Sequence, residues 1–309
     1  MNSMGSTFQP AATTTGTAPK VTGSIPTLKL SDGNEIPMLA FGLGTALYNG
    51  ESEQVINAAL TAIKAGFTHL DGAEVYGNEK DLGIAIKRSG VPRSQLFVTT
   101  KVWTVSTNVK AAFEGSLERL GLDYVDLYLV HWPQVADTPA KLQQVWAEVE
   151  EIHASGRAKS IGVSNFLQEH LETIFKTARA KPVINQVEFH PYLQHGGLVD
   201  FHRQHGIATA AYAPLTAITK AQQGPVDDIY ISLARKYGVT MSDIALRWVI
   251  DQGIVAVTTS NNEQRLQGYL TKLPNFKLTP AEIQEISSLG NQKHYRGFFN
   301  DIYGPNDRR

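Results

Sequence analysis

Cysteine is absent from the 309 residues of this sequence. Disulfide bonds, thiolate metal ligands and a cysteine nucleophile are therefore excluded, and the absence fits a reducing compartment such as the cytoplasm. An excess of one charge is also missing, because 28 basic and 29 acidic residues leave a formal net charge of -1. Such a chain has no overall field to attract nucleic acid or an anionic membrane. We expect its partners to be small molecules, and we expect a monomer.

Residues 1–23 lack both a long apolar run and a set of arginines. They therefore resemble neither a secretory signal nor a membrane anchor, and a transit peptide would carry more basic residues than Lys20 alone. Because the segment is rich in Ser, Thr and Ala, we expect a disordered tail. We expect residues 24–309 to form one domain, a length that suits a single parallel barrel with extensions.

Apolar runs of strand type alternate with helical patterns along most of the chain. The eight runs are MLAFGLG, FTHLDGA, LFVTTKV, VDLYLVH, SIGVSN, VINQVEF, IATAAYAP and IVAVTTS. Helices are predicted near 51–65, 78–89, 108–120, 139–155, 167–179, 197–205, 227–237 and 280–289. Eight strands, each followed by helical sequence, indicate an α/β protein with a (β/α)8 barrel rather than an open doubly wound sheet.

Both ends of this barrel carry extensions in the prediction. Residues 25–37 hold two short apolar runs around an Asp32-Gly33 turn, which predicts a β-hairpin that caps the barrel floor. Residues 291–309 are irregular but contain Tyr295, Phe298, Phe299 and Tyr303. These aromatic residues favour a C-terminal loop that docks over the mouth of the barrel.

Three polar residues stand at intervals of thirty along the chain, each at the end of an apolar run: Asp71, Lys101 and His131. Residues that end successive strands of a βα repeat meet at one rim of a parallel barrel, where such barrels place catalytic groups. Tyr76 follows Asp71 by five positions and joins them from the next loop. Taken singly, such residues are more often packing, helix-capping or structural, so it is their joint placement that predicts a site.

These four side chains favour proton-transfer chemistry. A free phenol titrates near a pKa of about 10, so Tyr76 needs a neighbouring cation to become a useful acid. An ammonium of Lys101 about 4 Å away would supply roughly 4 kcal/mol at an effective dielectric near 20, which would move the phenol pKa toward neutrality. Asp71 would keep Lys101 charged, and His131 could hold a substrate carbonyl oxygen beside the Tyr76 hydroxyl.

The motifs around these residues resemble those of the aldo-keto reductase family, from about Leu28 to Phe299. The similar segments are DGAEVYGNE at 71–79, LERLGLDYVDLYLVHWP at 117–133, GVSNF at 162–166, NQVEFHP at 185–191 and VTTSNNEQR at 257–265. The resemblance implies metal-free hydride transfer from reduced nicotinamide to an aldehyde or ketone. It implies that Tyr76 is the general acid, that Lys101 and Asp71 lower its pKa, and that His131 orients the carbonyl. Alcohol oxidation is expected in reverse.

The cofactor implied by the resemblance is NADPH, with NADH as a weaker substitute. No GxGxxG motif follows a predicted strand, so the dinucleotide would lie extended over the barrel mouth. Ser260 and Arg265 suit an anionic group at a helix N-terminus, whereas Thr259 stands where much of the family has a lysine. The cofactor contacts expected by resemblance are Thr45, Ser164, Asn165, Gln186, Tyr212, Pro214, Leu215, Thr259, Ser260, Asn261 and Arg265.

The substrate pocket is expected to be large and apolar, which suits a hydrophobic or aromatic carbonyl compound. Ala46 takes a position where many family members have a tryptophan, and this should open one wall. The wall residues expected from barrel position and resemblance are Ala46, Val75, Trp103, Trp132 and Phe298. For both tryptophans, plain core packing remains the alternative.

Two other functions stay open on the sequence alone. A Schiff-base aldolase could use Lys101 as its nucleophile on the same barrel, although Asp71 beside it argues against a neutral amine. A nicotinamide-binding regulatory subunit could share the whole fold without turnover. The intact set of four polar residues favours the reductase.

Overall fold

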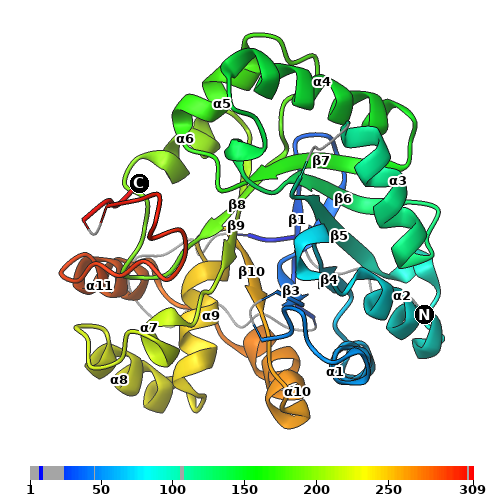
Figure 1. Cartoon of the computed structure of the whole chain (residues 1–309). Coiled ribbons are helices and arrows are strands. Elements are labelled where there is room, and N and C mark those ends of the chain that lie inside the picture. The colour runs from blue at the N-terminus through cyan, green and yellow to red at the C-terminus, as the bar shows by residue number, and fades with distance from the viewer. Residues whose placement is uncertain (1–6, 10–23, 45, 105–107, 305) are drawn as a thin grey trace.

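The computed structural model describes residues 7–9, 24–44, 46–104, 108–304 and 306–309. Eight parallel strands close into a barrel in the order β10-β3-β4-β5-β6-β7-β8-β9, and helices surround it (Figure 1). The strands are β3 (Leu39–Gly42), β4 (His69–Asp71), β5 (Phe97–Val102), β6 (Val125–Val130), β7 (Ala158–Ser164), β8 (Ile184–Glu188), β9 (Ala208–Tyr212) and β10 (Val255–Thr258). The predicted (β/α)8 architecture is confirmed.

The strands are buried on both faces, which is why they appear in the sequence as nearly continuous apolar runs. All six residues of β5 and all six of β6 are buried. One face of each strand packs against the helices and the other fills the barrel interior, so that polar residues facing inward must find their partners within the protein. The charged pair of Asp71 and Lys101 lies in this interior, near the carboxyl ends of the strands.

Most predicted helices form within a few residues of their expected bounds. The helices are α1 (Ser52–Ala65), α2 (Glu79–Ser89), α3 (Val109–Leu120), α4 (Pro139–Ala154), α5 (Gln168–Phe175), α6 (Leu198–Gln204), α7 (Thr216–Thr219), α8 (Asp227–Tyr237), α9 (Met241–Ile250), α10 (Glu263–Lys272) and α11 (Pro280–Gly290). Local sequence sets several helix ends. Helix α11 begins with a capping box of Thr279 and Glu282, and Pro280 is its first residue. Helix α1 is followed by Gly66 in a left-handed conformation, with φ 112°.

Three helices differ from the prediction. Helix α5 ends at Phe175 instead of continuing to residue 179. The short α7 and the longer α9 were not predicted at all. In α9 every residue from Asp243 to Ile250 is buried, and the helix follows α8 without an intervening strand, so the alternation of strands and helices gave it no place. The capping box of Thr240 and Asp243 marks its start.

The predicted hairpin forms and closes the barrel floor. Strands β1 (Thr27–Lys29) and β2 (Glu35–Pro37) pair in antiparallel fashion. Leu30 and Ile36 are buried together with Phe97, Leu127 and Val255 of the barrel strands. Water is therefore excluded from this end, and ligands must enter from the other.

Part of the predicted N-terminal tail also has a defined place. The Phe8 amide donates to the Thr27 carbonyl at 2.8 Å, and the Lys277 ammonium donates to the Gln9 carbonyl. These two contacts attach residues 8 and 9 to the rest of the protein, and the disordered tail expected over residues 1–23 stays a prediction. Residues 1–6 and 10–23 lie outside the described part of the chain.

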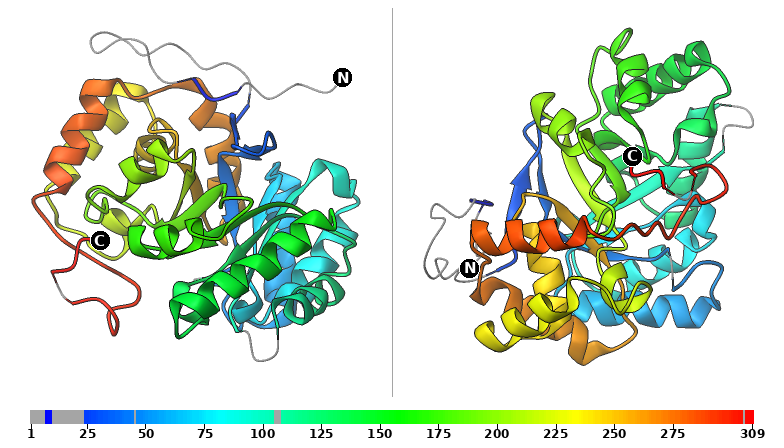
Figure 2. Two further views of the ribbon diagram at one scale, coloured as in Figure 1. Left: turned by 90° about the horizontal axis from the view of Figure 1, so that it is seen from above. Right: turned by 90° about the vertical axis from the view of Figure 1, so that its left-hand side faces the viewer.

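The C-terminal segment, residues 291–309, lies at the opposite end of the barrel from the hairpin (Figure 2). Its described residues form neither helix nor strand, yet they are attached by backbone hydrogen bonds such as that from Tyr295 N–H to the Tyr192 carbonyl at 3.2 Å. These bonds attach the segment to the rest of the protein, and its role as a loop over the mouth of the barrel stays a prediction. Within the described residues, no helix has the length and apolar character needed to span a bilayer.

Candidate active site

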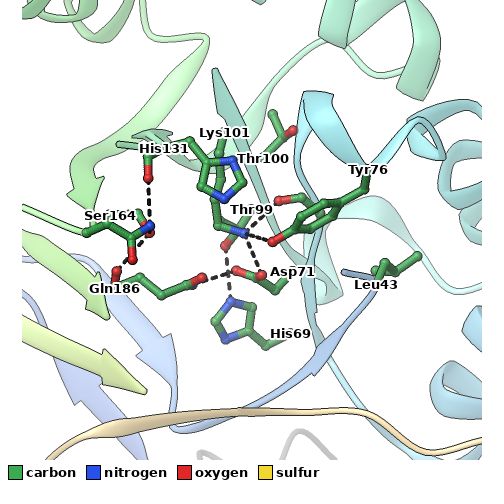
Figure 3. Close-up of polar contacts among 12 residues, drawn as sticks. Leu43, His69, Asp71, Tyr76, Thr99, Thr100, Lys101, His131, Ser164 and Gln186 are labelled. Carbon is green, nitrogen blue, oxygen red and sulfur yellow. Dashed lines mark hydrogen bonds and ion pairs between the residues drawn. The ribbon is translucent and has the colours of Figure 1, made fainter. Parts of the chain in front are cut away.

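The strand-end residues meet inside the barrel at the carboxyl ends of its strands, as their spacing predicted (Figure 3). Asp71 ends β4, and its register partner on β5 is Thr99, two residues before Lys101. The Lys101 ammonium donates to Asp71 Oδ1 at 2.6 Å and to the Gly72 carbonyl at 2.8 Å. Gln186 of β8 donates to the other Asp71 oxygen at 2.8 Å. Both members of this ion pair are buried, so neither relies on water for its partners.

Tyr76 reaches the same cluster from a short 3-10 helix, η1 (Glu74–Tyr76). Its hydroxyl oxygen lies 3.5 Å from the Lys101 ammonium. The ring fits only because Gly44 has no side chain, since a Cβ at that position would lie 2.8 Å from Tyr76 Cζ. Sequence and packing therefore combine to place one phenol hydroxyl beside one buried cation.

The effect of this cation on Tyr76 is smaller than the sequence predicted. Burial raises the pKa of the Tyr76 hydroxyl, and the nearby Lys101 charge lowers it by a smaller amount, so the net pKa is above its ordinary value. The predicted movement toward neutrality is therefore wrong for the protein alone. The physical reason is desolvation, which a calculation from charge separation omits. Tyr76 consequently stays protonated at neutral pH.

Lys101 keeps its charge despite complete burial. Burial alone would lower the pKa of Lys101, but the attraction of Asp71, together with that of Tyr76, outweighs burial and leaves the pKa above its ordinary value. An ammonium has no lone pair with which to attack a carbonyl. The aldolase alternative therefore loses its nucleophile.

His131 follows β6 and faces the Tyr76 ring edge-on, with 5.6 Å between the ring centroids. Burial, reinforced by the Lys101 charge, holds the pKa of His131 well below its ordinary value. The ring is therefore neutral at physiological pH and carries one N–H. Its Nδ1 atom is buried without a hydrogen-bond partner among the described residues. A neutral donor beside a protonated phenol suits a carbonyl oxygen better than it suits an anion.

A cavity of about 520 Å³ opens above these residues. It is lined by Gly42, Gly44, Tyr48, Asp71, Val75, Tyr76, Trp103, His131, Asn165, Gln186, Tyr212, Ala213, Pro214, Leu215, Thr216, Thr219, Lys220, Val257, Thr258, Thr259, Phe298 and Phe299. Its walls are mainly aromatic and aliphatic, with few polar groups at the base. Cavities of this size and character hold small organic ligands.

The predicted cofactor contacts divide into three groups. Asn165, Gln186, Tyr212, Pro214, Leu215 and Thr259 line the cavity. Ser164, Ser260, Asn261 and Arg265 do not, since the Ser164 hydroxyl is buried against the Gln186 carbonyl at 2.8 Å and the other three belong to the loop and first turn of α10. Thr45 lies outside the described residues. The helix cap at α10 is Asn262, which accepts from Arg265 N–H at 2.9 Å.

Three of the five residues predicted for the substrate wall line the cavity. Val75, Trp103 and Phe298 line the cavity. Trp132 does not line it but stacks on Trp103 at 4.5 Å, so it supports the wall from behind. Ala46 is exposed and outside the lining. Both tryptophans are half-buried, which excludes plain core packing.

Several lining residues were not predicted from the sequence. Lys220 lies at the end of α7. Tyr48 comes from the loop after β3 and contacts the Tyr76 ring edge-on at 6.4 Å. Both come from irregular segments, where periodicity gives no signal. Their type alone, aromatic or cationic in a loop after a strand, was the available indication.

The part of the cavity near Tyr212 and Thr259 has features that suit an extended dinucleotide. The Thr259 hydroxyl lines it and is buried without a hydrogen-bond partner among the described residues. The Tyr212 ring forms part of the wall, and its hydroxyl donates to Asn165 Oδ1 at 2.9 Å, which fixes both side chains. A flat ring against Tyr212 and polar groups near Thr259 would find partners already in place.

Residues 40–291 match the family model described as Aldo/keto reductase family. The chain belongs to this family. An NAD/NADP-dependent indole-3-acetaldehyde reductase of Schizosaccharomyces pombe is 38% identical over 273 residues, which cover 86% of this chain and 96% of that protein. A glyoxal reductase of Bacillus subtilis is 37% identical over 268 residues, which cover 85% of this chain and 92% of that protein.

Solved structures of aldo-keto reductases have the same fold. A Bombyx mori aldo-keto reductase in complex with NADP aligns with a TM-score of 0.82 at 34% identity, covering 91% of this chain and 97% of that chain. The predicted family resemblance is confirmed. This aldo-keto reductase is an NAD(P)-dependent oxidoreductase that acts on carbonyl groups of small molecules.

Proposed function

We propose that this aldo-keto reductase uses NADPH to reduce a hydrophobic aldehyde or ketone, with Tyr76 as the proton donor. The observation that carries the proposal is the contact of the Tyr76 hydroxyl with the Lys101 ammonium, 3.5 Å away, while Asp71 holds that ammonium at 2.6 Å. The cluster lies at the base of the cavity, where a carbonyl oxygen can reach the Tyr76 hydroxyl and the His131 ring together.

Each residue then has a defined task in the reduction. When bound, reduced nicotinamide supplies the hydride for the carbonyl carbon. The neutral His131 ring donates to the carbonyl oxygen and fixes its direction. Tyr76 gives its proton to the same oxygen as negative charge develops there, and Lys101 stabilises the phenolate that remains. An alkoxide is a far stronger base than a phenolate, so the transfer is favourable even with the raised pKa of Tyr76.

The aromatic wall supports a planar or hydrophobic substrate. Trp103, Trp132 and Phe299 form a stack, with centroid separations of 4.5 Å and 6.1 Å. A flat apolar group can add to such a stack and also displaces water from the site. The relatives that are named as reductases of indole-3-acetaldehyde and of glyoxal indicate that both aromatic and small carbonyl compounds should be tested.

The direct test is the loss of reduced-nicotinamide absorbance when the purified protein is mixed with an aromatic aldehyde or a vicinal diketone. We expect consumption of NADPH, with a lower KM for the aromatic aldehyde than for glyoxal. Tight NADPH binding without turnover across a broad panel of carbonyls would contradict the proposal and favour a regulatory nicotinamide-binding role.

The preference for NADPH depends on Arg265 in this proposal. Arg265 lies exposed in the first turn of α10, where both the helix N-terminus and the guanidinium attract a 2′-phosphate. Arg265→Ala should weaken NADPH binding by roughly tenfold or more and leave NADH binding nearly unchanged. Cofactor titration by fluorescence would measure both. Lys272→Ala, which removes a cation from the last turn of the same helix, is the control, and equal losses for the two cofactors would refute the assignment.

The reduction should depend little on pH between about 6 and about 9, because no proposed group titrates there. His131, whose pKa is well below its ordinary value, remains neutral above about 6, and Tyr76, whose pKa is raised, remains protonated up to about 9. Alcohol oxidation needs the phenolate as base, so its rate should rise with pH over the same range. Initial rates in both directions would show this, and an acidic limb near pH 6.5 in kcat/KM would contradict a neutral His131.

A further inference from the structure

We propose that Glu188 is a positioning residue for substrate selectivity, because it holds the C-terminal segment that supplies one wall of the cavity. This inference rests on the proposed reductase function. Glu188 ends β8, two residues beyond Gln186, and its side chain is buried. Its Oε1 accepts from Gly297 N–H at 2.8 Å and its Oε2 accepts from Phe298 N–H at 3.1 Å. One carboxylate thus binds two consecutive amides that belong to no helix or strand.

The fit between carboxylate and segment is close. A Cβ on residue 297 would lie 3.0 Å from Glu188 Oε1, so the glycine at this position allows the approach. His190, fully buried, places its Nε2 3.0 Å from the same oxygen. Because the segment forms no regular structure of its own, these bonds to a strand of the barrel fix its height above the cavity. In this contact the barrel strand is rigid, and the C-terminal segment is the part that can move.

Phe298 connects the anchored C-terminal segment to the cavity, because its ring forms part of the cavity wall. Its ring meets the Tyr212 ring edge-on at 5.3 Å, and the Lys220 ammonium lies 4.4 Å from its centroid. All three residues line the cavity. The adjacent Phe299 stacks against the Trp132 ring, with 6.1 Å between the ring centroids. Loss of the Glu188 anchor would therefore release both phenylalanines, and with them the contacts that a bulky carbonyl compound makes and a small one does not.

The test compares Glu188→Gln with Glu150→Gln in the full chain. Glu150 is a matched control, since it is also buried and its Oε1 accepts from Arg179 N–H and Ala180 N–H at 2.6 Å, but it lies on α4, outside the cavity lining. For Glu188→Gln we expect the ratio of kcat/KM for an aromatic aldehyde to that for methylglyoxal to fall roughly tenfold, through KM. For Glu150→Gln the ratio should stay within about twofold.

Hydrogen exchange supplies a readout that does not depend on turnover. Glu188→Gln should speed amide exchange at residues 297–299, and Glu150→Gln should not. Phe298→Ala should lower the substrate ratio as Glu188→Gln does, while the Gly297 amide stays protected. If Glu188→Gln does not fold, Gly297→Ala makes the same test, because its Cβ crowds the carboxylate.

Two results would overturn the proposal: unchanged exchange at 297–299 in the Glu188 variant, or faster exchange with an unchanged substrate ratio. Absence of turnover with every carbonyl would instead refute the proposed function, and the exchange comparison would still decide whether Glu188 holds the segment.

Discussion

Tyr76→Phe should lower kcat for carbonyl reduction by about a thousandfold or more, because it removes the only proton proposed to reach the carbonyl oxygen. The ring itself remains, so the close packing against Gly44 and the edge contact with His131 are kept. Cofactor affinity should therefore change by less than about twofold. Stopped-flow or steady-state NADPH oxidation gives the rate, and fluorescence titration gives the affinity.

A second phenol provides the control for this experiment. Tyr48 lies at the rim of the cavity, half exposed, with its ring centroid 6.4 Å from that of Tyr76. Its hydroxyl has no part in the proposed proton transfer, so Tyr48→Phe should reduce kcat by less than about threefold. Substantial turnover in Tyr76→Phe would show that another group protonates the product, and His131 would be the first to examine.

The sequence predicted that Asp71, Lys101 and His131 would meet, because their placement follows from the repeat. Asp71, Lys101 and His131 come from successive strands of a parallel barrel, and such strands end at the same rim whatever lies between them. The barrel, its hairpin and most helices were also predictable, because local patterns of apolar residues and turn residues indicate each of them.

The remaining features depend on tertiary contacts that no local pattern records. Helix α9 is buried from Asp243 to Ile250 and follows α8 with no strand between them, which breaks the alternation of strands and helices. The pKa of Tyr76 depends on how deeply the ring is buried, and charge spacing along the chain contains no measure of depth. Glu188 meets Gly297 and Phe298 across more than a hundred residues of chain, so its anchoring role became visible only in the folded protein.

Lys101→Met should impair both stability and catalysis, for two separable reasons. Removing the ammonium leaves Asp71 as a buried charge with only Gln186 as a side-chain hydrogen-bond donor among the described residues, which should cost about 3–5 kcal/mol of unfolding free energy. It also removes the cation 3.5 Å from the Tyr76 hydroxyl, whose gross attraction for a phenolate is roughly 4 kcal/mol at an effective dielectric near 20. We expect kcat to fall by about a hundredfold or more.

The double variant Lys101→Met with Asp71→Asn separates these effects. It removes both charges, and replacing a buried ion pair by neutral groups is often close to neutral for stability. Urea unfolding should therefore show most of the lost stability restored, while kcat for reduction stays as low as in Lys101→Met, because Tyr76 still lacks its cation. Recovery of kcat together with stability would mean that Lys101 only holds the barrel together. Low kcat in a restored fold would establish that its charge acts on the Tyr76 proton.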